Sequence, residues 1–72
     1  MERKNSGINS ARQTLKILQS IILSTKDLRL KDLSDEIGLH ISTIHRYLNI
    51  LIETGYVRKV TGGFYKPGFK LL

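Results

Sequence analysis

The chain has 72 residues, with twelve Lys and Arg against six Asp and Glu, a formal charge of +6 and a pI near 10.0. So short a chain forms one domain at most and has little room for a catalytic pocket, so we expect a binding module and not an enzyme. The cationic surplus favours an anionic partner, most often nucleic acid, although a membrane surface and a simple role in solubility are also consistent with it.

The sequence contains no cysteine, which excludes a disulfide framework, a thiolate nucleophile and a cysteine-based zinc site. The first residues, 1–6, are charged and lack the apolar run of a signal peptide. No stretch reaches the roughly 18 apolar residues of a membrane span. We therefore expect a cytoplasmic protein with no membrane partner and no cofactor.

The N-terminal segment, residues 1–9, is polar and without periodicity, which predicts a flexible basic arm before a single domain over residues 10–72. Ser10 and Gln13 form a capping-box pattern, which predicts that the first helix begins at Ser10 and runs to about Ser24. Four apolar residues recur at helical spacing, with Thr14 and Ile21 beside them: Ala11, Leu15, Leu18 and Ile22. This apolar stripe is expected to lie in the core, and the alternative is an interface.

A short alternating run, Leu28-Arg29-Leu30, predicts a brief strand that pairs with a later hairpin. The next segment, residues 31–37, reads as a short helix with Leu33 and Ile37 on its inner face. Gly38 follows where a helix usually ends, because glycine adopts a left-handed conformation without a Cβ clash.

The third helix is predicted over residues 40–54. Its apolar residues fall within one arc at 100° per residue: Ile41, Ile44, Tyr47, Leu48, Leu51 and Ile52. The opposite arc is polar: Ser42, His45, Arg46, Asn49 and Glu53. The helix is expected to close at Gly55.

The last predicted element is a β-hairpin over residues 56–66. Its strands, 56–60 and 64–66, flank a tight turn, and Pro67 ends the ladder because it has no amide hydrogen. The expected fold class is therefore mainly α (α+β): a three-helix winged helix-turn-helix with a small antiparallel β-hairpin wing.

The polar arc of the third helix has the character of a recognition helix in the major groove of duplex DNA. Arg46 can contact guanine bidentately or clamp a phosphate, and Asn49 can pair with adenine. The other candidate donors near the helix start, where free amides would add to phosphate binding, are His40, Ser42, Thr43 and His45. The alternative is an ordinary amphipathic surface helix, whose exposed face is also polar.

The hairpin has a thin, cationic tip that can lie along the phosphate backbone or enter a minor groove. The wing residues expected at DNA are Arg58, Lys59, Thr61, Gly62, Gly63 and Lys66. Phosphate contacts here would supply affinity, and the recognition helix would supply sequence preference. The alternative is a surface hairpin without a partner.

Catalytic and metal signals are weak. His40 and His45 are five residues apart and do not share one helix face as a helical metal pair does. The carboxylates of Asp32, Asp35 and Glu36 are more simply a solvated face of the second helix. We expect neither a metal site nor catalytic residues.

Three runs carry a family resemblance: residues 33–39 (Leu-Ser-Asp-Glu-Ile-Gly-Leu), 42–48 (Ser-Thr-Ile-His-Arg-Tyr-Leu) and 55–57 (Gly-Tyr-Val). Together they resemble the N-terminal winged helix of IclR-type transcriptional regulators. The start of the first helix, Ser10-Ala11-Arg12, and the closing Tyr65, Gly68, Leu71 and Leu72 also fit that family. Pro67 and His40 depart from it, since an aliphatic residue and a proline are usual at these positions.

The resemblance implies an operator-binding domain that acts as a homodimer and regulates transcription. It places four side chains in or beside the major groove: Ser42, Thr43, His45 and Arg46. Members of the family continue into an effector-binding domain, which is absent from this chain, so the chain is either a piece of a longer protein or a stand-alone module. Two alternatives to sequence-specific DNA binding remain open: a protein–protein assembly module, and non-specific nucleic-acid or RNA binding.

Overall fold

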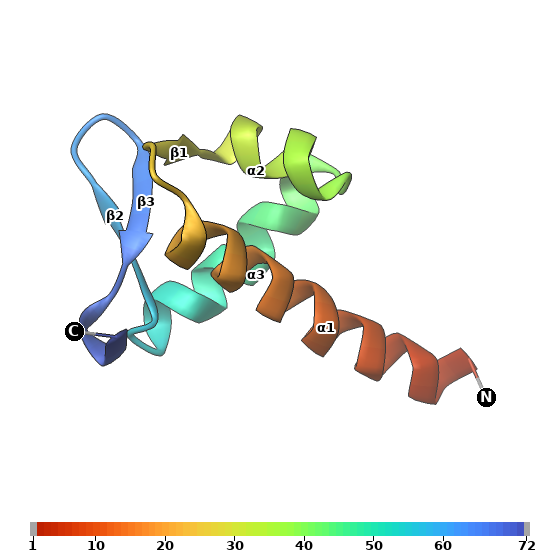
Figure 1. The fold of residues 1–72 in the computed structure, drawn as a ribbon. Helices are drawn as coiled ribbons and strands as arrows, with labels where there is room; N and C mark the ends of the chain where they lie inside the picture. The colour runs from red at the N-terminus through yellow and green to blue at the C-terminus, as the bar shows by residue number, and fades with distance from the viewer. Residues whose placement is uncertain (1, 72) are drawn as a thin grey trace.

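A computed structural model describes the backbone of residues 2–71 and the side chains of residues 9–71. In chain order the elements are α1 (Glu2–Leu23), β1 (Leu28–Arg29), α2 (Leu30–Ile37), α3 (Ile41–Glu53), β2 (Val57–Val60), β3 (Phe64–Pro67) and the 3-10 helix η1 (Phe69–Leu71). The three α-helices surround a small core that the sheet closes on one side (Figure 1). The predicted winged helix-turn-helix fold class is confirmed.

The first helix is longer than the sequence pattern predicts. α1 begins at Glu2, so the predicted helix start at Ser10 is wrong, and the described residues 2–9 of the predicted arm are helical. Ser10 lies inside the helix, where its carbonyl accepts a 2.7 Å hydrogen bond from Thr14 Oγ1. Extending an existing helix gains one hydrogen bond for each residue that is fixed, and Glu, Arg and Lys favour the helical conformation. The helix therefore continues through Ser10, although Ser10 and Gln13 match a capping pattern.

The core face of α1 also differs from the predicted stripe. The structure buries Ile17 and Ile21, which are 0% and 3% exposed, whereas Leu15 and Ile22 are 63% and 45% exposed. Both sets have helical spacing, and at 100° per residue they lie roughly a third of a turn apart. Periodicity shows that a helix has an apolar stripe, but it does not show which of two stripes faces the core.

The turn between α2 and α3 is fixed by local hydrogen bonds. Asp32 Oδ2 accepts from the Arg29 amide at 2.9 Å at the start of α2. Gly38 ends that helix as predicted, with φ of 84° and its amide donating to the Ser34 carbonyl at 2.9 Å. Ser34 Oγ then donates to the Leu39 carbonyl at 2.6 Å. These bonds set the direction in which α3 leaves the turn.

The core forms where α1, α2 and α3 meet the sheet. From α3 it takes Ile44, Leu48 and Leu51, as predicted, with Tyr47 and Ile52 half-buried. Ile41, predicted on the same arc, is 42% exposed because it lies in the first turn and at the flank of the arc. The other buried residues are Ile17, Ile21, Leu28, Leu33, Val57 and Tyr65.

The sheet is antiparallel, with strand order β1-β3-β2, so the predicted pairing of residues 28–29 with the hairpin is confirmed. Leu28 lies opposite Tyr65, and Pro67 is the last residue of β3, opposite Val57. Leu28, Val57 and Tyr65 share the face of the sheet that covers the core. The turn between β2 and β3 contains two glycines with positive φ, Gly62 at 95° and Gly63 at 81°.

Candidate nucleic-acid interface

The outward face of α3 carries the side chains that the sequence analysis singled out. Ser42, His45, Arg46 and Asn49 are all exposed, whereas Thr43 is half-buried. Ile44, Leu48 and Leu51 anchor the opposite face in the core. Because packing fixes the rotation of the helix about its axis, the polar residues form one constant surface. Thr43 lies at the edge of this surface rather than in its middle.

Arg46 has the greatest reach on this surface. Among residues 9–71 it has no carboxylate within ion-pair distance, and the one acid of α3, Glu53, lies near the far end of the helix. A guanidinium without an intramolecular partner keeps all five of its N–H donors for an external acceptor. The geometry therefore leaves Arg46 available for a base edge or a phosphate.

His40 caps α3. Its backbone is extended (φ −61°, ψ 146°), and its Nδ1 accepts from the Ser42 amide at 3.3 Å and lies 2.9 Å from Ser42 Oγ. The His40 carbonyl accepts from the amides of Thr43 and Ile44, each at 3.0 Å. The amides of Ser42, Thr43 and Ile44 are thus already used, so the expected supply of free amides at this helix start is smaller than predicted. His40 can approach DNA with its Nε2 edge only.

We predict that His40→Ala lowers the free energy of unfolding by about 0.5–2 kcal/mol, the usual loss when a capping side chain is removed. His40→Ser should recover most of that loss, because a hydroxyl accepts the same amide hydrogen bond. Urea denaturation followed by circular dichroism measures both variants. Equal stability of His40→Ala and the parent would show that the ring does not cap α3.

Two of the wing cations are held by contacts within the chain. Arg58 Nε donates to the Pro67 carbonyl at 3.0 Å, and Lys66 Nζ pairs with Asp27 Oδ1. Lys59 is exposed, with its ammonium 5.8 Å from the centre of the Tyr65 ring. Because exposed ion pairs are weak, Lys66 can exchange Asp27 for a phosphate. Lys59 needs no such exchange and is the readiest phosphate ligand of the wing.

The tip of the wing is small and accessible. Thr61 and Gly62 are exposed and Gly63 is half-buried, and the Gly63 amide donates to the Val60 carbonyl at 3.1 Å. No hydrogen bond or ion pair between described side chains joins this tip to the polar face of α3. The two predicted DNA-contacting regions are therefore separate surfaces, positioned by the core and not by each other.

Sequence reasoning missed one cation, Arg29. Its guanidinium carbon lies 4.6 Å from the centre of the Phe64 ring, on the face of the sheet that points away from the core. Arg58 and Lys66, which lie opposite each other in the ladder, share this face. The alternation of Leu28-Arg29-Leu30 was the available signal, because burial of Leu28 points Arg29 outward.

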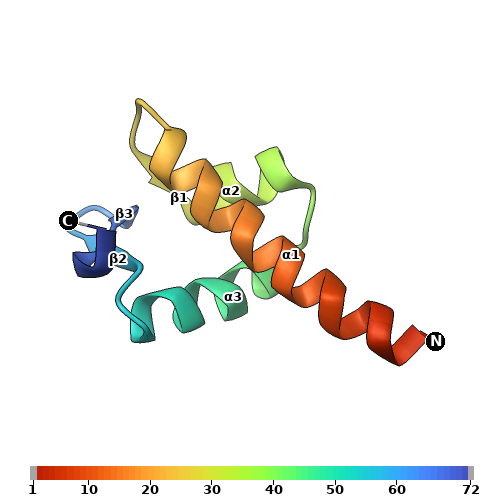
Figure 2. The ribbon, with the colours of Figure 1, turned by 60° about the horizontal axis from the view of Figure 1, so that its bottom comes forward.

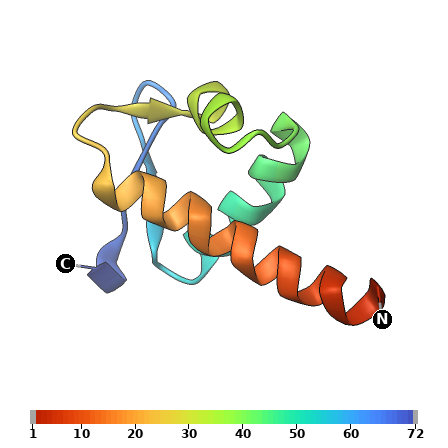
Figure 3. The same ribbon diagram turned by 45° about the vertical axis from the view of Figure 1, so that its right-hand side comes forward.

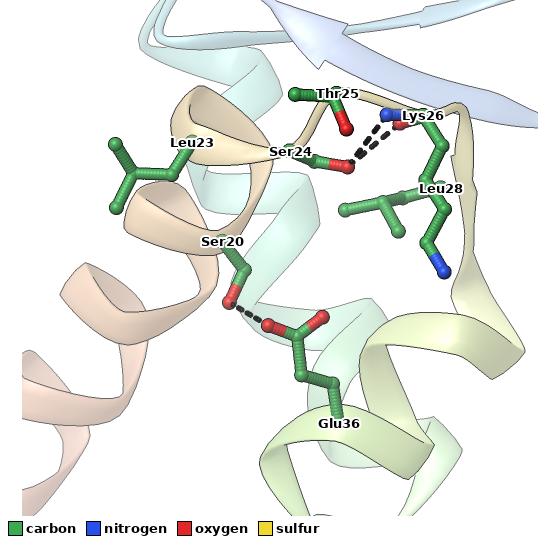
Figure 4. A pocket seen from close by; sticks show the side chains of 7 residues that line it. All are labelled: Ser20, Leu23, Ser24, Thr25, Lys26, Leu28 and Glu36. Atoms are coloured by element: carbon green, nitrogen blue, oxygen red, sulfur yellow. Dashed lines mark hydrogen bonds between the residues drawn. The ribbon is translucent and has the colours of Figure 1, made fainter.

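A hollow of about 270 Å³ lies between the end of α1, the turn after it and α2 (Figure 4). Its polar groups bond one another: Ser20 Oγ donates to Glu36 Oε2 at 3.1 Å, and Ser24 Oγ donates to the Lys26 carbonyl at 2.7 Å. Small-molecule pockets usually exceed roughly 300 Å³ and keep polar groups for the ligand. These bonds instead tie α1 to α2 and close the turn.

Within residues 2–71, no helix has the length and apolarity needed to cross a membrane. The same part of the chain holds no group of three or more His, Cys, Asp or Glu residues that could bind a metal ion.

Comparison with known proteins identifies the family to which this fold belongs. Residues 10–61 match the IclR helix-turn-helix domain. The IclR structure of Thermotoga maritima has a TM-score of 0.82 and 25% identity, covering 89% of this chain and 26% of that one. HmgR of Pseudomonas aeruginosa has a TM-score of 0.80 and 26% identity, over 88% and 27%. The repressor BlcR of Agobacterium tumefaciens, 20% identical with a TM-score of 0.78 over 92% and 26%, shows the same fold.

No match was found among curated proteins. The chain spans about a quarter of the length of the solved structures that it resembles. The family match covers most of the chain, includes both helices of the helix-turn-helix and reaches the tip of the wing. The chain therefore belongs to the IclR helix-turn-helix family, whose domains bind DNA in transcription regulators and are not enzymes.

Proposed function

We propose that the chain binds a specific duplex sequence, with α3 in the major groove and the wing on the phosphate backbone or in the adjacent minor groove, and that two copies occupy paired half-sites. The observation that carries the proposal is the exposed Arg46 on a helix whose opposite face is locked in the core. Rigid placement matters because a bidentate contact discriminates bases only when the side chain arrives in one orientation.

The roles divide by chemistry. Arg46 and Asn49 have the two-point hydrogen bonding needed at base edges, and Ser42 and His45 supply single bonds to a base or phosphate. Thr43, at the edge of the surface, suits a phosphate, as does the Nε2 edge of His40. In the wing, Arg58, Lys59, Lys66 and the tip residues Thr61, Gly62 and Gly63 contribute affinity without sequence preference.

Selection from a pool of random duplexes tests the proposal directly. Sequence-specific binding should enrich one motif, and paired half-sites should appear as an inverted repeat, since the symmetry of a site mirrors that of a two-fold dimer. Binding without enrichment would leave a non-specific nucleic-acid function. No duplex binding would exclude DNA as the partner.

Arg46→Ala should weaken binding to the selected site by about 1–3 kcal/mol and relax preference at one base position. The reason is the loss of a bidentate contact together with one charge. Gel-shift titration at fixed salt measures the change. Lys16→Ala is a matched control, because it removes the same charge from an exposed position on α1. Equal losses of affinity in the two variants would show that Arg46 contributes only through its positive charge and not through a contact with a base.

Lys59→Ala should weaken binding to every duplex alike and reduce the slope of log K against log salt by about 0.9, the value of one phosphate contact. Lys66→Ala should change the slope less, because Lys66 must first give up Asp27. Titrations at four or more salt concentrations, on the selected site and on an unrelated duplex, give both slopes. An unchanged slope for Lys59→Ala excludes a phosphate contact there.

An assembly module is the second candidate, and one observation favours it: Ile50 on α3 is 48% exposed beside the polar face. A partner protein would cover this side chain, whereas a DNA-binding helix needs it at most for an apolar contact. Ile50→Ser should leave the affinity for the selected duplex within a fewfold of the parent. If Ile50→Ser abolished binding to a partner protein and Arg46→Ala left that binding unchanged, the assembly module would be favoured.

A further inference from the structure

The face of the sheet that points away from the core, here called the outer face, carries three cations that differ in what engages them. Lys66 pairs with Asp27, and Arg58 Nε donates to the Pro67 carbonyl at 3.0 Å. Arg29 is exposed, and among residues 9–71 its guanidinium has no carboxylate within ion-pair distance. Arg29 is therefore the cation of the outer face whose charge is left for an external anion.

The side chain of Arg29 is held by the ring of Phe64. The two residues lie opposite each other in the ladder between β1 and β3, and the guanidinium carbon is 4.6 Å from the centre of the ring. The backbone of Arg29 is fixed as well, because its amide donates to Asp32 Oδ2 at 2.9 Å. A phenyl ring has no oxygen or nitrogen acceptor, so the contact orders the guanidinium and leaves its N–H donors for an oxygen ligand.

The same ring lies against the tip of the wing. A Cβ added at Gly62 would lie 2.8 Å from Phe64 Cε2 and 3.1 Å from Cδ2, so the ring packs directly on the backbone of Gly62. Figure 1 and Figure 3 show the turn between β2 and β3 beside β1 and the start of α2. Phe64 therefore contacts both the tip and Arg29, and an extended polyanion that lies along the tip can contact Arg29 as well.

We propose that Arg29 contacts a DNA phosphate and that Phe64 is the residue that positions it, an inference that rests on the proposed duplex binding and adds a contact to it. An arginine side chain loses rotamer freedom when it binds, and the contact with Phe64 removes part of that freedom before DNA arrives. A phosphate contact supplies affinity and register, not base preference. Figure 2 shows the sheet at the end of the molecule where α3 finishes, so this contact is separate from the polar face of α3.

The spacing of the charges favours a phosphate backbone over an acidic protein segment. Arg58 and Lys66 lie opposite each other on the outer face, and Lys66 is two residues along β3 from Phe64 and its partner Arg29. Two residues of a strand span about 7 Å, so the cations form a line and not a single point. A nucleic-acid strand presents a line of negative charge whatever its sequence, whereas a protein segment needs carboxylates at matching positions.

Arg29→Gln tests the phosphate contact. The change keeps a polar side chain but removes the charge, so the slope of log K against log salt should fall by about 0.9, on the selected site and on an unrelated duplex alike. Lys16→Gln is the matched control: it removes one charge from an exposed position on α1 and should leave the slope unchanged. A slope for Arg29→Gln equal to that of the parent overturns the proposal, and an acidic protein would then be the partner to seek for the outer face.

A double-mutant cycle tests the positioning role of Phe64, which is half-buried. Phe64→Leu keeps an apolar side chain without the aromatic face, and should weaken duplex binding about two- to fivefold, the equivalent of an exposed cation–π contact. The same change should have a smaller effect in the Arg29→Gln background, and Phe64→Tyr, which keeps the ring, should bind as the parent does. Equal effects of Phe64→Leu in the two backgrounds would show that the ring does not act through Arg29.

NMR of the free chain separates the ring contact from DNA binding. The side-chain protons of Arg29 should show ring-current shifts in the parent and in Phe64→Tyr and lose them in Phe64→Leu; equal shifts in all three exclude the ring contact. If the parent binds duplex DNA but Arg29→Gln leaves the salt slope unchanged, the Arg29 contact is wrong and the DNA-binding proposal stands. If the parent binds no duplex, the DNA-binding proposal fails and the phosphate contact fails with it, and the NMR spectra still decide whether Phe64 holds Arg29.

Discussion

Ile17→Ala is expected to lower the free energy of unfolding by about 2–5 kcal/mol, the range for truncating a fully buried aliphatic side chain. Ile17 is 0% exposed and belongs to the core cluster, which also takes residues from α2, α3 and the sheet. Leu15→Ala removes a similar volume from the same helix, two residues away, but from a side chain that is 63% exposed. Its cost should stay below about 1 kcal/mol, because little cavity is created.

Urea denaturation followed by circular dichroism compares the free energies of unfolding of the two variants. A chain of 72 residues has a total stability of only about 4–11 kcal/mol, so the loss in Ile17→Ala is large enough to unfold a chain at the lower end of that range without denaturant. Ile17→Val, with an expected loss of about 0.5–1.5 kcal/mol, then gives the measurement. A larger loss for Leu15→Ala than for Ile17→Ala would mean that the stripe predicted from spacing is the true core face.

The contrast between Ile17 and Leu15 also shows where sequence reasoning reaches its limit. In α3 one apolar arc lies opposite one polar arc, so the sequence pattern assigns Ile44, Leu48 and Leu51 to the core without ambiguity. α1 has two apolar stripes, and the choice between them depends on which surface α2 and the sheet present. This choice depends on tertiary packing, which the spacing of residues within one helix does not determine.

The turns could be predicted for a different reason. Gly38 and the Gly62-Gly63 pair all have positive φ, a conformation that other residues adopt at a cost, so their identity marks the position directly. The start of α1 had no such mark. Ser10 and Gln13 fit a cap, but the same residue types are tolerated inside a helix, and Thr14 bonds the Ser10 carbonyl there.

The candidate site was predictable residue by residue but not in its internal contacts. The outward positions of Ser42, His45, Arg46 and Asn49 follow from helical geometry alone. The ion pair between Lys66 and Asp27 joins residues that are 39 apart in sequence, so no local sequence pattern predicts it. The sequence therefore predicts which residues of the wing are cationic. Only the fold shows that Lys59, unlike Arg58 and Lys66, has no hydrogen bond or ion pair to a described residue that it must break to bind a phosphate.

Gly68→Ala is expected to lower the free energy of unfolding by about 2–4 kcal/mol, through overpacking and the loss of backbone hydrogen bonds. A Cβ at Gly68 would collide with the Gly55 carbonyl oxygen and lie 2.8 Å from the Val57 amide nitrogen. Both neighbours are backbone atoms, so no side chain can move aside. The Gly68 amide donates to the Tyr56 carbonyl at 2.9 Å, and the Lys70 amide donates to the Gly55 carbonyl at 2.9 Å.

These two bonds fasten the end of the wing to the end of α3, so the expected loss includes the attachment of the wing. Gly38→Ala is the matched control. Its φ of 84° makes alanine strained, but a Cβ there meets nothing within 4 Å, so about 1 kcal/mol should be lost. Thermal unfolding of both variants gives the order of stability, and the salt slope of DNA binding reports whether the wing stays in place. Equal stability of Gly68→Ala and Gly38→Ala would show that residues 55 and 68 do not approach so closely in solution. The backbone atoms around Gly68 would otherwise have to move to make room for the added methyl group.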